Sequence, residues 1–82
     1  MNNKYLIYVT YDIKIGDSNI IAYISTNKDV FHTIGEIMFR SLYKINRITF
    51  VDYKESSIKW IKENNIPLNV FKEKYIGGYN NE

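Results

Sequence analysis

The chain has 82 residues and a formal net charge of +2 at pH 7, and 41 of its residues are Ile, Lys, Asn or Tyr. It has no cysteine and one histidine, which excludes a disulfide framework and a thiolate metal site. The codons of the four abundant residues are rich in A and T, so the composition indicates a low-GC genome. A chain of this length forms one domain, residues 1–82, with a small core. Residues 77–82 are predicted to be a flexible tail.

The N-terminal apolar run, Tyr5–Val9, is too short for a signal peptide and reads as a strand. No stretch approaches the roughly 18–20 apolar residues of a membrane span. We therefore expect a cytoplasmic protein without a membrane partner, or a protein of the host cytoplasm if a phage encodes it.

The first third of the chain has the pattern of a β-hairpin. Residues 4–15 alternate between two faces and are rich in β-branched and aromatic side chains, which predicts a strand. Residues 16–19, Gly-Asp-Ser-Asn, are typical of a turn. Residues 20–25 are predicted to return as the second strand.

A helix is predicted over residues 27–45, with Thr26 as its N-cap and Asp29 completing a capping box. At 100° per residue, its apolar side chains fill an arc of about 140°, wide enough to cover a sheet. They are Val30, Phe31, Ile34, Ile37, Met38, Leu42 and Ile45. The polar side chains on the opposite side are Asp29, His32, Glu36, Arg40 and Tyr43.

Residues 47–53 predict a third strand, and Ser56 or Ser57 is expected to cap a second helix that ends near Asn65. The tail from Pro67 is compatible with a third helix and with an extended segment. The ββαβα order and the right-handed crossover rule predict an α+β domain with a three-stranded sheet. This sheet is a split β-α-β arrangement of order 2-1-3 with the helices on one face.

The second face of that sheet would then be open and rich in tyrosine, with Tyr8 at its centre. Three interpretations compete: the tail covers this face, a protein binds to it, or it stacks single-stranded bases. We predict a protein interface. The candidate partner-binding residues are Leu6, Tyr8, Thr10, Tyr23, Val51 and Tyr53.

A second candidate surface is basic. Residues 40–62 carry six basic and two acidic side chains, a local balance of +4. A solvated surface explains this balance most simply, and a nucleic-acid-binding regulator is the alternative. The residues that would contact phosphate are Arg40, Lys44, Arg47, Lys54, Lys59 and Lys62.

Catalytic chemistry finds little support. Asp29, His32 and Glu36 share a helix face, but the chain has no second histidine to complete a zinc site. Glu36 precedes Arg40 by four residues, the spacing of a surface ion pair. We therefore predict a solvated polar face, no enzymatic activity, no metal and no cofactor.

These exclusions leave a small non-enzymatic protein-binding module as the predicted function. Small single domains of low-GC genomes are often accessory proteins of phages or mobile elements. We expect such a protein to inhibit or modulate a host protein by occupying its surface, for example a defence nuclease such as CRISPR machinery. The partner is a host protein or a second copy of the chain, so a homodimer is one of the expected states.

Overall fold

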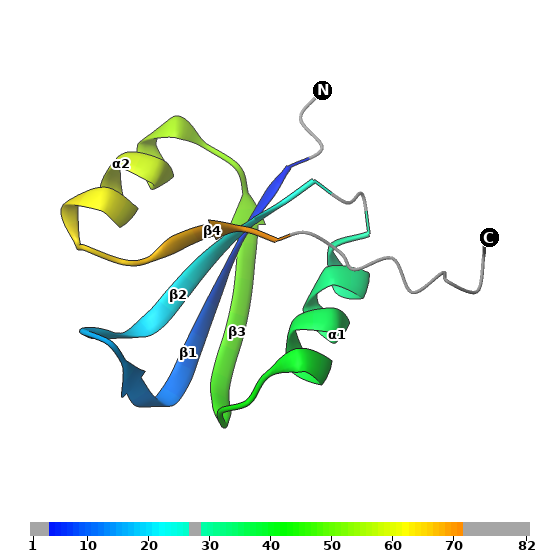
Figure 1. Cartoon of the computed structure of the whole chain (residues 1–82). Coiled ribbons are helices and arrows are strands. Elements are labelled where there is room, and N and C mark those ends of the chain that lie inside the picture. The colour runs from blue at the N-terminus through cyan, green and yellow to red at the C-terminus, as the bar shows by residue number, and fades with distance from the viewer. Residues whose placement is uncertain (1–3, 27–28, 72–82) are drawn as a thin grey trace.

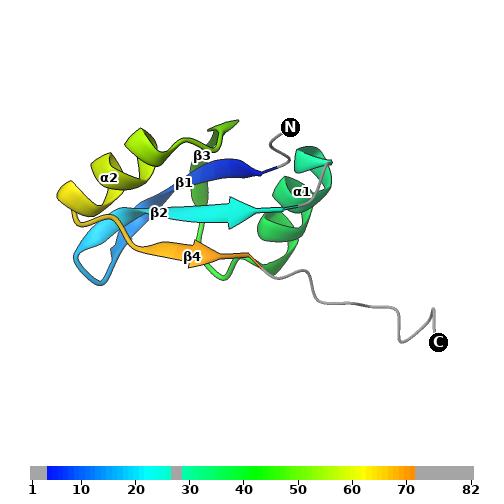
Figure 2. The same cartoon turned by 90° about the horizontal axis from the view of Figure 1, so that it is seen from above.

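The computed structural model describes residues 4–26 and 29–71, which form an α+β domain with a mixed sheet between two helices (Figure 1). In chain order the elements are β1 (Tyr5–Ile15), β2 (Ser18–Ser25), α1 (Val30–Arg40), β3 (Ile45–Asp52), α2 (Glu55–Glu63) and β4 (Leu68–Val70). The strands lie in the order β3-β1-β2-β4 (Figure 2). β1 is antiparallel to both neighbours, and β4 is parallel to β2.

The predicted hairpin is confirmed. β1 and β2 pair in an unbroken register from Tyr5 opposite Ser25 to Thr10 opposite Ile20. Gly16 has a φ of 71°, a conformation that glycine adopts without strain. The turn is shorter than predicted because β2 already begins at Ser18.

Helix α1 is shorter than the predicted helix at both ends. It begins at Val30, and its N-cap is Asp29 rather than Thr26. The Asp29 carboxylate accepts hydrogen bonds from the main-chain N–H groups of Phe31 and His32 at 3.1 and 3.2 Å. The helix ends at Arg40 because Ser41 is extended, with φ −64° and ψ 131°. Residues 27 and 28 lie outside the described residues.

The following elements are shifted by one or two residues from the prediction. β3 begins at Ile45, which was expected to be helical. α2 begins at Glu55 with Lys54 as N-cap and without a side-chain capping bond, so neither predicted serine caps it. The predicted stop at the asparagine pair is confirmed, because Asn65 has a φ of 54°.

The sheet has a fourth strand that the sequence analysis did not predict. Leu68–Val70 pairs with β2, beginning with Leu68 opposite Ala22. The Pro67 carbonyl accepts a hydrogen bond from Ala22 N–H at 2.8 Å, and Phe71 N–H donates to the Ile24 carbonyl at 2.9 Å. These residues lie at the edge of the sheet, so a third helix is wrong for them. The predicted tail, residues 77–82, lies outside the described residues.

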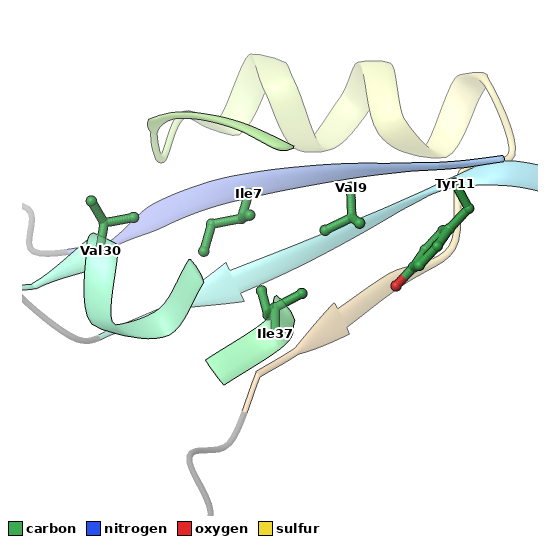
Figure 3. Packing of buried hydrophobic residues seen from close by; sticks show 5 residues of the cluster. All are labelled: Ile7, Val9, Tyr11, Val30 and Ile37. Atoms are coloured by element: carbon green, nitrogen blue, oxygen red, sulfur yellow. The ribbon is translucent and has the colours of Figure 1, made fainter. Parts of the chain in front are cut away.

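The two helices cover opposite faces of the sheet, which corrects the prediction that both lie on one face (Figure 3). The crossover through α1 runs from β2 across β1 to β3, and the crossover through α2 runs back from β3 to β4. Two right-handed crossovers that run in opposite directions across a sheet place their helices on opposite faces.

The core therefore consists of two layers. On the α1 face the buried cluster contains Ile7, Val9, Tyr11, Val30 and Ile37 (Figure 3). On the α2 face it contains Leu6, Ala22, Ile61 and Ile66. Because the neighbours Leu6 and Ile7 are both fully buried, β1 is covered on both sides along its first half.

Candidate protein-interaction surface

The sheet face predicted to be open is covered by α2. Leu6 is fully buried and belongs to the same cluster as Ile61 of α2. Tyr8 is half-buried, and its ring meets the Trp60 ring edge-on with centroids 6.3 Å apart. Leu6 and Tyr8 thus stabilise the second layer of the core, and Tyr8 is not the centre of an exposed interface.

The other predicted interface residues lie in different places. Thr10 is half-buried, and Tyr23 lies on the opposite, α1 face, because it pairs with Ile7. The Tyr53 hydroxyl donates to the Glu55 carboxylate at 3.1 Å, and this bond raises the pKa of Tyr53. Val51 remains exposed on β3. The six residues therefore do not form one surface.

The basic residues of the nucleic-acid alternative are also divided. Arg40 ends α1 on one face of the sheet, whereas Lys59 and Lys62 lie on α2 on the other. Lys44 precedes β3, Arg47 lies within it, and Lys54 precedes α2. The exposed side chains of α2 include Glu55 and Glu63 beside its lysines, so the local charge is balanced.

Polar side chains at the start and the end of α1 stabilise the helix itself. Asp29 caps the helix, and Glu36 binds Arg40 at 3.3 Å across one helical turn, which confirms the predicted ion pair. Within residues 4–26 and 29–71, no three side chains of His, Asp or Glu come close enough together to hold a metal ion.

An open hollow of about 410 Å³ lies beside the C-terminal end of α1. Its walls include Tyr11, Tyr23, Arg40 and Phe71. The Arg40 guanidinium lies 4.8 Å from the centre of the Phe71 ring, and the Tyr11 and Tyr23 side chains hydrogen-bond to each other. These polar groups interact within the hollow, so we assign it a structural role.

Burial and the bond to Tyr11 raise the pKa of Tyr23 to about 12 from its usual 10. A raised pKa means that neutral Tyr23 stabilises the folded state below pH 10, and that this stabilisation is lost as the pH rises to about 12. We expect the free energy of unfolding of Tyr23→Phe to fall less steeply than that of the parent between pH 10 and 12. Urea titrations across this interval test the expectation, and parallel curves for both proteins would contradict it.

Exposed apolar side chains gather where α1 meets β3. Phe31 is 69% exposed, and its ring contacts the Phe50 ring edge-on at 5.4 Å. Met38, 60% exposed, follows Phe31 by seven residues and therefore lies on the same side of α1. Phe50 and Val51 are themselves partly exposed, on the two faces of β3. Large apolar side chains that remain exposed together mark interaction surfaces.

The backbone of β3 adds to this region polar groups that no strand among the described residues pairs with. In an antiparallel pair, successive residues point their N–H and C=O groups alternately toward and away from the neighbouring strand. Tyr53 N–H donates to the Lys4 carbonyl at 3.1 Å, which sets the alternation. The groups that point away from β1 are therefore those of Ile48, Phe50 and Asp52. No described strand pairs with this side of β3.

The two edges of the sheet differ in their protection. β4 has only three residues and follows Pro67, two features that block pairing with another strand. β3 has eight residues and contains neither proline nor lysine. An irregularity near Asn46, between the pairs formed by Arg47 and Ile45, leaves a regular edge from Arg47 to Asp52. We call this edge, together with Phe31, Met38, Phe50 and Val51, the β3-edge surface.

Most of this surface was not predicted from the sequence. Phe31 and Met38 were expected to face the core because they belong to the apolar arc of the predicted helix. The arc was too wide for a helix of eleven residues, whose buried side chains are Val30, Thr33 and Ile37. A buried hydrogen bond between Thr33 Oγ1 and Ser25 Oγ, 2.9 Å long, holds the polar member of this stripe in the core.

Within the described residues, neither helix is long or apolar enough to cross a membrane. No protein-family model, curated protein or solved structure matches this chain.

Proposed function

We propose that the protein is a small non-enzymatic protein-binding module and that its interface is the β3-edge surface. The observation that carries the proposal is the exposure of Phe31, Met38, Phe50 and Val51 beside an eight-residue strand whose outer edge no described strand pairs with. Inhibition or modulation of the bound protein, by occupying its surface, is part of this proposal.

The chemistry of this surface suits a protein partner. An unpaired strand edge offers main-chain hydrogen bonds to an added strand, and the side chains on either side of it provide specificity. Phe31 and Met38 supply apolar area, and aromatic residues and methionine are enriched at protein interfaces. The charges on α2 are balanced, so this helix does not attract the phosphate backbone of a nucleic acid, which favours a protein as partner.

The double substitution Phe31→Ser with Met38→Ser is expected to weaken partner binding at least tenfold, because it removes two exposed apolar anchors without opening the core. The measurement is affinity capture from host lysate, quantified by mass spectrometry, with circular dichroism to confirm folding. The matched control is Phe39→Ser with Leu42→Ser. These side chains are 85% and 89% exposed but are not part of the β3-edge surface, so capture should persist.

The protein-binding proposal and the nucleic-acid alternative predict opposite results for two further changes. If the partner is a protein, replacing Lys59 and Lys62 by glutamine should leave capture unchanged, and capture should decrease little when the salt concentration rises from 50 to 200 mM. A phosphate binder would lose affinity steeply over this interval. Loss of binding in the lysine variant, with no loss in the Phe31 and Met38 variant, would overturn the proposal.

A further inference from the structure

We infer that a second copy of this chain binds the β3-edge surface by pairing its β3 antiparallel to the first, so that two sheets join into one. This inference rests on the proposed function and names a second copy of the chain as the partner; a host protein that binds the same surface would compete with this copy. It follows from three properties of the edge: its hydrogen-bonding pattern, the distribution of its charges and the arrangement of apolar side chains on its two sides.

The hydrogen-bonding groups of the edge are complementary to themselves. Ile48 and Phe50 direct N–H and C=O groups outward and are separated by one residue whose groups point to β1. A two-fold axis beside Thr49 places Ile48 of one copy opposite Phe50 of the other, and Phe50 opposite Ile48. Each of these two pairs exchanges both of its N–H and C=O groups, which supplies roughly four main-chain hydrogen bonds.

The charges along β3 favour the antiparallel direction. Lys44 precedes the strand and Arg47 lies near its start, and both are basic, whereas Asp52 is acidic and ends it. In the register above, antiparallel pairing places Arg47 opposite Val51 of the other copy, one residue from its Asp52 and on the other face of the sheet. The basic end of each copy therefore lies near the acidic end of the other, without a direct ion pair. Parallel pairing would place like charges side by side, which is unfavourable between paired strands. The two-fold arrangement is also closed, so it ends at a dimer.

The apolar side chains extend the contact beyond the backbone. A stable interface needs roughly 600 Å² from each partner, more than one strand edge supplies. Because the two-fold axis is perpendicular to the joined sheet, both α1 helices lie on the same face and turn their Phe31 sides toward each other. Phe31 and Met38 are thereby covered, and Val51 is covered on the other face.

A single-cysteine crosslink tests the register, since the chain has no cysteine of its own. Thr49 side chains on the two-fold axis form a non-hydrogen-bonded pair with Cβ atoms about 4.5–5.5 Å apart. A small adjustment brings them to the distance of a disulfide. We expect Thr49→Cys to form a covalent dimer under mild oxidation at least tenfold faster than the control Asp17→Cys. Asp17 is also exposed but lies in the hairpin turn.

Sedimentation equilibrium tests the interface without a new bond. Thr49→Lys places two ammonium groups against each other in the dimer while the residue stays exposed in the monomer. We expect the dissociation constant of its dimer to be at least tenfold higher than that of the parent dimer. Its melting temperature should be close to that of the parent protein diluted until it is monomeric. The control Thr49→Val keeps the β-branched shape and should remain dimeric.

A parent protein that is monomeric at several hundred micromolar, with Thr49→Cys crosslinking no faster than Asp17→Cys, would overturn this inference. Capture of a host protein that depends on Phe31 and Met38 would then still support the proposed function with a foreign partner. If the chain neither self-associates through β3 nor captures a host protein through Phe31 and Met38, both the inference and the proposed function are rejected.

Discussion

Replacing Ile61 by aspartate is expected to unfold the domain. Ile61 is fully buried in the α2 cluster with Leu6 and Ala22. An unpaired buried carboxylate costs about 3–5 kcal/mol, and the lost packing of the buried isoleucine costs about 2–5 kcal/mol more, so the total is comparable with the whole stability of the domain. A domain of this size has a total stability of roughly 4–12 kcal/mol. Loss of the circular dichroism signal, or a urea midpoint near zero, is the expected result.

Ser56→Asp is the control for this variant, because Ser56 is exposed in the first turn of the same helix, where a negative charge is favourable. Its stability should equal or slightly exceed that of the parent. If Ile61→Asp melted like Ser56→Asp, α2 would not pack on the sheet as described.

Replacing Ile37 by aspartate should destabilise the domain almost as strongly. Ile37 is 4% exposed and packs with Ile7 and Val9 beneath α1. Ile34, at the middle of the predicted apolar arc, is only half-buried, so Ile34→Asp leaves its carboxylate partly hydrated. We expect the loss of unfolding free energy to be at least 1 kcal/mol larger at position 37 than at 34. Equal losses, measured in urea, would show that α1 is rotated about its axis.

The strands and helices that the sequence predicted best are those with strong local signals. The hairpin of β1 and β2 follows from strict alternation and a Gly-Asp turn, both of which depend on neighbouring residues only. Helix α1 was recognised but extended too far, because apolar residues beyond Ser41 continue the helical spacing. The N-cap is Asp29, three residues after the predicted Thr26. The capping-box pattern alone does not show which of these two residues is the N-cap.

The location of the second helix could not be predicted without β4. Leu68–Val70 is too short to show alternation, and it pairs with a strand more than forty residues earlier in the chain. Once that pairing is known, the direction of the second crossover follows, and α2 must lie on the face of Leu6. Without this pairing, both helices were predicted on one face, and Leu6 and Tyr8 were therefore assigned to an exposed surface.

The exposed position of Phe31 is a tertiary property as well. Periodicity places it within the apolar arc, but the width of the sheet beneath α1 decides which part of that arc is buried. β3 is the outermost of the described strands on this side, and Phe31, whose ring meets the Phe50 ring, stays largely exposed. The candidate surface therefore depends on strand order, which no local pattern encodes.

Site-resolved amide hydrogen exchange of β3 tests the central claim most directly, because its two sets of N–H groups report on different neighbours. In the parent at high concentration, we expect slow exchange at Ile48 and Phe50, which point outward, and at Thr49 and Val51, which point to β1. In Thr49→Lys, the outward amides should exchange at least tenfold faster while the amide of Val51 stays protected. Fast exchange of Ile48 and Phe50 in both proteins, or equal protection in both, would contradict pairing through the β3-edge surface.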